Sequence, residues 1–241
     1  MLNIVIPMAG EGKRFKEQGY ILPKPMIDVC GKPMIIRVVR SFWAMAEQVQ
    51  FIFIAQKSHL AQGLADILKG KIIPIEKVTE GALCTTLLAR DIIDSSDELV
   101  VANCDQYLEW SFGKFLRQAR EYDGSLVVFN STNPHHSYAL LNKDNLVLRT
   151  AEKVVISDKA AAGIYYYKKG SEYISAADEM IKGNVRTNNE FYICPIYNVL
   201  ISRGQKISAY EVDVDNKHML GTPEELKIFI DKVHNQEVYL E

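Results

Sequence analysis

The apolar and polar positions of the first hundred residues repeat with two different periods. Short, almost uniformly apolar runs are typical of strands buried on both faces. These runs lie at residues 2–7, 50–55, 71–75 and 98–102. In other segments apolar residues recur every three or four positions, which predicts helices. These segments cover residues 33–46, 60–68 and 82–92. Strands that alternate with helices form a parallel sheet covered on both faces, so the pattern predicts a Rossmann-like, three-layer α/β/α fold.

The pattern is less regular in the second half of the chain. Further strands are predicted at residues 125–129, 138–141, 146–149, 161–167 and 207–212. Further helices are predicted at residues 112–121 and 172–182. Another is predicted after Pro195, ending at Arg203, and a last one begins at Thr222. Within 161–167, alternating burial is expected for the three tyrosines 165–167. We therefore expect a mainly parallel but mixed sheet in a single domain over residues 1–241. Residues 1–125 would hold a nucleotide-binding crevice, and residues 126–241 an acceptor-binding region.

Composition and charge exclude several classes of protein. The 241 residues carry 28 Lys+Arg and 30 Asp+Glu, a net charge of −2, which argues against nucleic-acid binding by phosphate neutralisation. No apolar run approaches the roughly 18 residues of a membrane-spanning helix. The four cysteines are scattered without a C-x-x-C pair, at Cys30, Cys84, Cys104 and Cys194. We expect free thiols, a cytoplasmic location, and neither a membrane nor a nucleic-acid partner.

A glycine-rich turn directly follows the first predicted strand. It reads Met8-Ala-Gly-Glu-Gly-Lys-Arg-Phe15. A dinucleotide-binding fingerprint would need a third glycine, but Phe15 follows, and the spacing of Gly10 and Gly12 does not fit a Walker loop. A loop that clasps a nucleotide triphosphate with backbone amides and Arg14 fits the residues. A tight turn without a ligand is the competing interpretation.

Other motifs favour the nucleotide interpretation. The turn and the segment Leu22-Pro-Lys-Pro-Met26 together resemble the signature of the sugar nucleotidylyltransferases, also called nucleotide-sugar pyrophosphorylases. Further segments resemble motifs of that family in the same order, at residues 79–89, 103–105, 152–153, 162–166, 189–192 and 221–226. The resemblance implies a nucleotidyltransferase fold and a Mg²⁺-dependent enzyme. Such an enzyme joins a nucleoside triphosphate to a small phosphorylated acceptor and releases pyrophosphate.

The resemblance also implies roles for individual residues. Arg14 would hold the phosphates that leave, because its planar fork suits phosphate oxygens. Lys24, held between two prolines, would lie between the α-phosphate and the incoming phosphate. Asp105 would bind Mg²⁺. The implied nucleotide-binding residues are Met8, Ala9, Gly10, Gly12, Gly81 and Ala82. The implied acceptor-binding residues are Lys153, Gly163 and Glu190.

The sequence departs from the family at the second metal ligand. An aspartate usually lies two residues before the terminal Gly-Thr, and this chain has Met219 there. Asp213 and Asp215 are near in sequence, and we favour Asp215 as the second ligand. The pair His135-His136 is interpreted as loop residues, because adjacent histidines point apart on a strand and no third ligand is suitably spaced.

The preferred base and acceptor rest on resemblance to one subgroup. The opening motif and the segment Gly81-Ala-Leu-Cys-Thr85 look most like small bacterial enzymes of capsule and surface-polysaccharide biosynthesis. That likeness favours CTP as the nucleotide, with phosphoglutamine or a sugar-1-phosphate as the acceptor. Two alternatives stay open: a glycosyltransferase of related fold, and a non-catalytic, nucleotide-binding regulatory paralogue. The oligomeric state is also open, a homodimer being one option.

Overall fold

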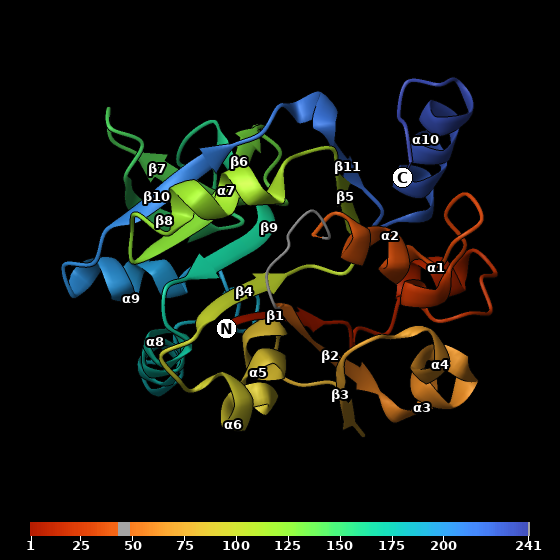
Figure 1. The fold of residues 1–241 in the computed structure, drawn as a ribbon, viewed down its shortest axis with the longest axis horizontal. Coiled ribbons are helices and arrows are strands. Elements are labelled where there is room, and N and C mark those ends of the chain that lie inside the picture. Colours follow the sequence, from red (N-terminus) through yellow and green to blue (C-terminus); the bar gives the residue numbers. More distant parts are fainter. Residues whose placement is uncertain (43–48, 241) are drawn as a thin grey trace.

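The computed structural model describes residues 1–42 and 49–240. Its main sheet has nine strands, seven of them in the order β10-β6-β9-β4-β1-β2-β3, with β7 paired to β8 and β9 (Figure 1). The strands are β1 (Leu2–Pro7), β2 (Val49–Gln56), β3 (Lys71–Ile75), β4 (Glu98–Ala102), β6 (Gly124–Asn130), β7 (Ser137–Leu141), β8 (Val147–Glu152), β9 (Lys159–Tyr167) and β10 (Ile207–Glu211). A separate two-stranded sheet pairs β5 (Gln106–Leu108) with β11 (Lys217–Met219).

The strand directions confirm the predicted sheet. β1 pairs in parallel with β2 and β4, β2 with β3, and β10 with β6. The antiparallel pairings within this sheet are those of β9 with β4, β6 and β7, and that of β7 with β8. The sheet is therefore mixed and mostly parallel, as the sequence predicts.

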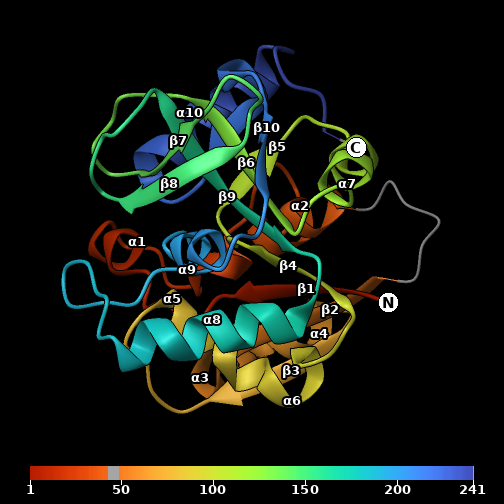
Figure 2. The ribbon, with the colours of Figure 1, turned by 90° about the vertical axis from the view of Figure 1, so that its left-hand side faces the viewer.

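Helices cover both faces of the sheet. They are α1 (Lys13–Glu17), α2 (Met34–Arg40), α3 (Lys57–His59), α4 (Ala65–Ile67), α5 (Ala82–Thr86), α6 (Arg90–Ile93), α7 (Phe112–Ala119), α8 (Gly170–Lys182), α9 (Ile196–Ser202) and α10 (Pro223–His234). Helices α5, α6, α8 and α9 pack on one face and α2 and α7 on the other (Figure 2). Within β1, Val5 belongs to the first core and Ile4 and Ile6 to the second. This two-sided burial explains the uniformly apolar strands and confirms the three-layer fold.

A third, smaller core joins the two ends of the chain. Phe15 and Met34 from the N-terminal region pack there with Leu226 and Phe229 of α10. Tyr107 of β5 lies in the same core. In Figure 1 α10 therefore lies next to α1 and α2, although about two hundred residues separate them in sequence.

Several predicted elements differ in detail. The helix expected over 60–68 is a π turn (Leu60–Leu64) followed by α4, and Gly63, with φ 96°, interrupts its α-helical geometry. The helix expected over 82–92 consists of α5, a 3₁₀ turn (Leu87–Ala89) and α6. The expected end of the first helix at Ala46 lies outside the described residues. The short strands β5 and β11 were not predicted.

The three tyrosines of β9 do not alternate in burial. Tyr165, Tyr166 and Tyr167 are all buried, with exposures of 6%, 0% and 0%. The prediction is wrong because β9 is an internal strand covered by both helical layers. None of the helices in residues 1–42 and 49–240 has the length and apolar character needed to cross a membrane.

Candidate active site

A cleft of about 470 Å³ opens beyond the carboxyl ends of β1 and β4. These parallel neighbours end at the same edge of the sheet, which is where α/β proteins bind ligands. The predicted site residues that line the cleft are Met8, Ala9, Gly10, Gly12, Arg14, Lys24, Gly81, Ala82, Asp105 and Glu190. Residues from four distant parts of the sequence therefore meet in one cavity.

The glycine-rich turn forms one wall of the cleft. The backbone N–H of Met8 donates to Ile54 at 2.9 Å, and the carbonyl of Ala9 accepts from the Gln56 side chain at 2.7 Å. Gly12, with φ 64°, begins helix α1 in a left-handed conformation that suits glycine. A Cβ atom on Gly10 would meet no atom of the described residues within 4 Å. The backbone of the turn is thus open to a ligand at Gly10.

Lys24 and Asp105 form an ion pair inside the cleft. Lys24 begins a 3₁₀ turn (Lys24–Met26) between two prolines, and its ammonium group donates to Asp105 Oδ2. The two side chains are only 17% and 23% exposed. Burial lowers the pKa of Lys24, but the charge and hydrogen bond of Asp105, together with nearby Cys104 and Glu225, outweigh burial, and the pKa lies above its ordinary value. Burial raises the pKa of Asp105, but Lys24, with smaller contributions from Lys217 and a backbone hydrogen bond, lowers it below its ordinary value, so both groups are charged near neutral pH.

Two neighbours define the chemistry around Asp105. Burial raises the pKa of the Cys104 thiol to about 12, so this group is protonated and is not a nucleophile. On the other side, a Cβ atom on Gly221 would lie 3.3 Å from Asp105 Oδ2 and 3.2 Å from Glu225 Oε2. The carboxylates of Asp105 and Glu225 therefore approach the same point beside the cleft.

A second cavity of about 260 Å³ adjoins the first, since Ala82 and Asn103 line both. The predicted acceptor residues Lys153 and Gly163 lie in it. The Lys153 ammonium donates to the Tyr192 hydroxyl, which donates to Glu190 Oε2 at 2.5 Å. Because Glu190 lines the first cavity and Tyr192 the second, this chain of contacts connects the two.

Two predicted glycines are required by close contacts within the protein. A Cβ atom on Gly163 would lie 2.4 Å from Asn103 Nδ2, in the wall of the second cavity. A Cβ atom on Gly81 would lie 2.4 Å from the carbonyl oxygen of Phe191. Gly81 therefore allows the backbone next to Glu190 to cross the start of α5.

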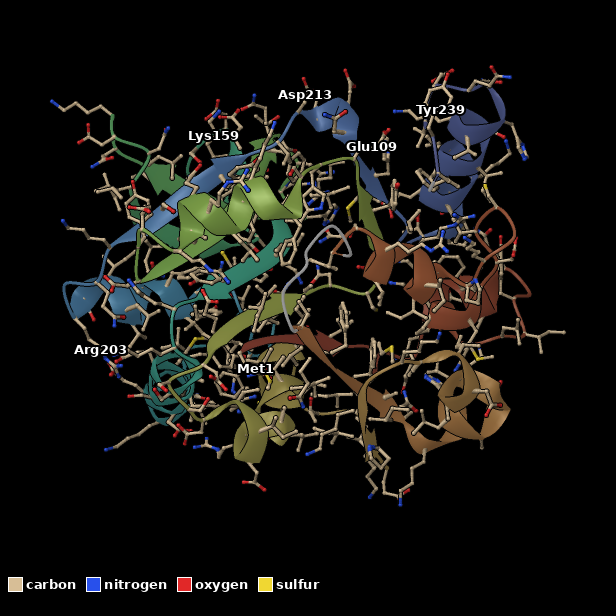
Figure 3. The ribbon with its side chains drawn as sticks, in the orientation of Figure 1. Met1, Glu109, Lys159, Arg203, Asp213 and Tyr239 are labelled. Carbon is tan, nitrogen blue, oxygen red and sulfur yellow. The ribbon has the colours of Figure 1, made fainter. Side chains whose placement is uncertain are left out.

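The structure does not bring Asp215 to either cavity. Asp215 is exposed in a 3₁₀ turn (Val214–Asn216), where its backbone N–H donates to Asp213 Oδ1 at 3.0 Å. Asp213 lies at the outer edge of the molecule (Figure 3). The structure therefore argues against the expectation that Asp215 is the second metal ligand. The turn carries this side chain into solvent before β11 returns the chain toward Asp105.

Sequence reasoning missed several polar residues near the cavities. Gln106 and Lys217 line the second cavity, and Glu225 approaches Asp105. Glu152, which belongs to the matched segment 152–153 but was given no role, also lines the second cavity. Glu225 lies within the matched Gly-Thr-Pro-Glu-Glu-Leu segment, where it could have been singled out as an acid in a first helical turn. Gln106 and Lys217 lie on strands of three residues, which are too short to show a periodic pattern in the sequence.

Comparison with known proteins identifies relatives of this chain. Residues 4–210 match the family model described as nucleotidyl transferase. The bifunctional protein GlmU of Campylobacter curvus is 24% identical over 248 aligned positions, covering 98% of this chain and 54% of the relative. GlmU of Brucella anthropi is 28% identical over 227 positions, covering 89% and 48%. The chain thus spans about half the length of these curated relatives.

Solved structures share the whole fold. A nucleoside-diphosphate-sugar pyrophosphorylase from Vibrio cholerae RC9 is similar, with a TM-score of 0.84, 28% identity, and coverage of 95% of this chain and 99% of that one. An inositol-1-phosphate CTP transferase from T. maritima has a TM-score of 0.72 and 13% identity over 96% and 95% of the two chains, a likeness of fold alone. The match over residues 4–210 covers most of the sequence, and the chain therefore belongs to the nucleotidyl transferase family.

Proposed function

We propose that this protein transfers a nucleotidyl group from a nucleoside triphosphate to a small phosphorylated acceptor and releases pyrophosphate. The observation that carries the proposal is the partly buried Lys24–Asp105 pair, which lies in a cleft that adjoins a second polar cavity. A cleft for the triphosphate and a neighbouring cavity for the acceptor are what a transfer between two phosphates requires.

The reaction brings two polyanions together, so positioning and charge neutralisation are its main demands. The acceptor phosphate attacks the α-phosphorus, and the bond to the bridging oxygen of pyrophosphate breaks. Arg14 at the mouth of the glycine-rich turn would hold the departing phosphates. Lys24 would offset the repulsion between the α-phosphate and the attacking phosphate, and Lys153 would bind the acceptor.

The carboxylates near Gly221 suit a magnesium ion. Mg²⁺ is usually bound by one or two carboxylates, with phosphates and water as the other ligands. Asp105 would provide the first carboxylate and Glu225, in place of Asp215, the second. Among the residues that the structure describes, no three His, Cys, Asp or Glu side chains are grouped for metal binding, so substrate phosphates would complete the coordination. Bound Mg²⁺ would neutralise phosphate charge during the transfer.

We favour CTP as the nucleotide and phosphoglutamine or a sugar-1-phosphate as the acceptor, in the synthesis of capsule or surface-polysaccharide precursors. The support is the sequence resemblance to the capsule subgroup and the likeness of fold to an inositol-1-phosphate CTP transferase. We further propose a cytoplasmic, single-domain enzyme, with a homodimer as its candidate assembly. The residues 1–125 and 126–241 contribute most of the first and second cavities respectively, which supports the division into nucleotide-binding and acceptor-binding halves.

One observation favours a non-catalytic regulatory paralogue as the second candidate. Met219 occupies the position of the usual second aspartate, and its sulfur accepts a hydrogen bond from Lys217 at 2.7 Å. The Lys24–Asp105 pair argues for the enzyme, because nucleotide binding alone does not need a partly buried charge pair in a cleft that adjoins a second polar cavity.

The test is pyrophosphate release with Mg²⁺, crossing four nucleoside triphosphates with phosphoglutamine, sugar-1-phosphates, inositol 1-phosphate and phosphocholine. Turnover confined to one pair would establish the reaction, the base and the acceptor together. In the active pair, Lys227→Met is the matched control for a Lys24→Met variant, because it removes an exposed lysine that pairs with Asp231 on α10. Tight triphosphate binding without turnover for any acceptor would favour the regulatory paralogue.

A further inference from the structure

The short sheet β5–β11 presents two polar side chains to the second cavity. Gln106 lies opposite Met219 in the antiparallel register, and Lys217 lies two residues before Met219. Alternate residues of a strand share a face, and Lys217 and Met219 both line the cavity. The intervening residue, His218, instead contacts the rings of Tyr107 and Phe229. The register of the two strands thus directs Gln106 and Lys217 toward the proposed acceptor.

Gln106 carries a buried hydrogen-bond donor without a partner. The residue is only 3% exposed, and no atom of the described residues accepts from its Nε2 group. Buried donors are nearly always paired, because an unpaired one forfeits its hydrogen bonds to water. A Cβ atom at Gly163 would lie 3.0 Å from this nitrogen, so the glycine leaves room beside the amide in the wall of the second cavity. The missing acceptor is supplied most simply by a ligand.

Lys217 carries a charge that its direct contacts only partly balance. Its ammonium group donates to the Met219 sulfur at 2.7 Å and lies 4.1 Å from the centre of the Phe129 ring. A thioether is a weak acceptor and a ring has no net charge, so the ammonium keeps capacity for an anion. Burial lowers the pKa of Lys217 to about 8, while Asp105 and Glu225 oppose the decrease.

Lys217 lies on the side of the second cavity that faces Asp105. β11 leads directly to Leu220, whose backbone N–H donates to the carbonyl of Asp105 at 2.8 Å. Lys153, by contrast, contacts Tyr192 and through it Glu190. The two lysines therefore approach the cavity from different elements, β11 and the loop after β8. An acceptor phosphate at Lys217 would lie beside the Lys24–Asp105 pair, with its organic part extending toward Gln106.

We propose that Lys217 and Gln106 form an acceptor-binding pair in this protein. Lys217 holds the acceptor phosphate at the junction of the two cavities, and Gln106 donates a hydrogen bond to an oxygen of the group that bears it. The ligand class is a phosphorylated small molecule whose organic part offers a hydroxyl or carbonyl oxygen near the phosphate. The inference rests on the proposed function, since it assigns the second cavity to the acceptor.

The test measures binding without turnover. Calorimetric titrations use inorganic phosphate and inositol 1-phosphate as probes, with Mg²⁺ and saturating pyrophosphate present to fill the polyphosphate part of the first cleft. The variants are Lys217→Met, which keeps the length of the side chain, and Gln106→Leu, which keeps its approximate shape. Lys217→Arg retains the charge, and Lys227→Met removes an exposed lysine outside both cavities.

We expect Lys217→Met to weaken the binding of both probes by about 10- to 100-fold, the loss typical of a charge-assisted contact. Lys217→Arg should recover part of this loss, and Lys227→Met should bind like the wild type. Gln106→Leu should leave phosphate binding unchanged and weaken inositol 1-phosphate binding by about 5- to 10-fold. Wild-type protein that binds neither probe, or a folded Lys217→Met variant with wild-type affinity, would overturn the proposal. If the ratio of the affinities for inositol 1-phosphate and inorganic phosphate is the same in Gln106→Leu as in the wild type, the role of Gln106 is overturned.

The outcomes also separate this inference from the proposed reaction. If Lys217→Met loses phosphate binding but no substrate pair releases pyrophosphate in the wild type, the anion site stands and the transferase proposal fails. If the wild type releases pyrophosphate and Lys217→Met binds both probes normally, the reaction stands and the role of Lys217 is rejected.

Discussion

Replacing Gly81 by alanine should destabilise the protein and distort both cavities. Gly81 has φ 127° and ψ 172°, a combination that side-chain-bearing residues rarely adopt. An added Cβ atom would lie 2.4 Å from the carbonyl oxygen of Phe191 and 2.7 Å from its nitrogen. Both are backbone atoms, so a side-chain rotation cannot relieve the clash. The segment that carries Phe191 must move away from the start of α5.

The size of the effect follows from these contacts. The strained backbone costs about 1–3 kcal/mol, and overpacking costs about 1–3 kcal/mol. The movement also strains the hydrogen bonds from Phe191 to Glu80 at 2.8 Å and from Leu83 to Phe191 at 3.1 Å. Weakening one of them costs about 1 kcal/mol. We therefore expect the free energy of unfolding to fall by roughly 3–7 kcal/mol, or a decrease in Tm of roughly 6–28 °C for a chain of this length.

Thermal and urea unfolding would measure this loss, and Gly10→Ala is the matched control. At Gly10 an added Cβ atom meets no described atom within 4 Å, so its Tm should stay within about 3 °C of the wild type. The same variant should weaken triphosphate binding, because the methyl group enters the cleft. A Gly81→Ala protein as stable as the wild type would refute the claim that the crossing of Phe191 requires glycine.

Three further predictions concern charge. Lys24→Met should lower kcat for pyrophosphate release by about 10²- to 10³-fold in a folded protein, because an electrostatic contact to the reacting phosphates is lost. A kcat within tenfold of the wild type would contradict the proposed role of Lys24. Asp105→Asn should raise the Mg²⁺ concentration for half-maximal nucleotide binding at least about tenfold, and an unchanged Mg²⁺ titration would argue against this ligand. Burial lowers the pKa of His136 to about 4, below the 6.5 of the unfolded chain, so its contribution to stability is complete above pH 6.5 and is lost as the pH falls toward 4. His136→Gln should therefore reduce the decrease in Tm over this range, whereas His234→Gln, at an exposed position of α10, should not; equal slopes would disprove the assignment.

Much of the fold could be predicted because its central strands are buried on both faces. Residues such as Val5 and Ile6 point into opposite cores, so the strand reads as a continuous apolar run. The main site residues were accessible for a related reason. The glycine-rich turn and Asp105 follow directly after β1 and β4, and the ends of adjacent parallel strands necessarily lie together.

The rest of the site depends on contacts that leave no local pattern. β5 and β11 have three residues each, too few to show a period, and they pair although more than a hundred residues separate them. Their register decides that Gln106 and Lys217 face the second cavity. The choice between Asp215 and Glu225 is of the same kind, because it depends on where the chain turns before Gly221. Proximity in sequence favours Asp215, whereas the fold brings Glu225 toward Asp105.

The third core explains why the end of the chain completes the site. Phe15, which follows the glycine-rich turn, packs in the same cluster as Leu226 and Phe229 of α10. Helix α10 also carries Glu225, whose backbone N–H is held by the Thr222 side chain at 3.2 Å. The packing that fixes the phosphate-binding turn therefore also fixes the carboxylate that approaches Asp105. A substitution that loosens this core, even at a residue that touches no substrate, should weaken triphosphate and Mg²⁺ binding together, because one apolar cluster positions the groups proposed for both.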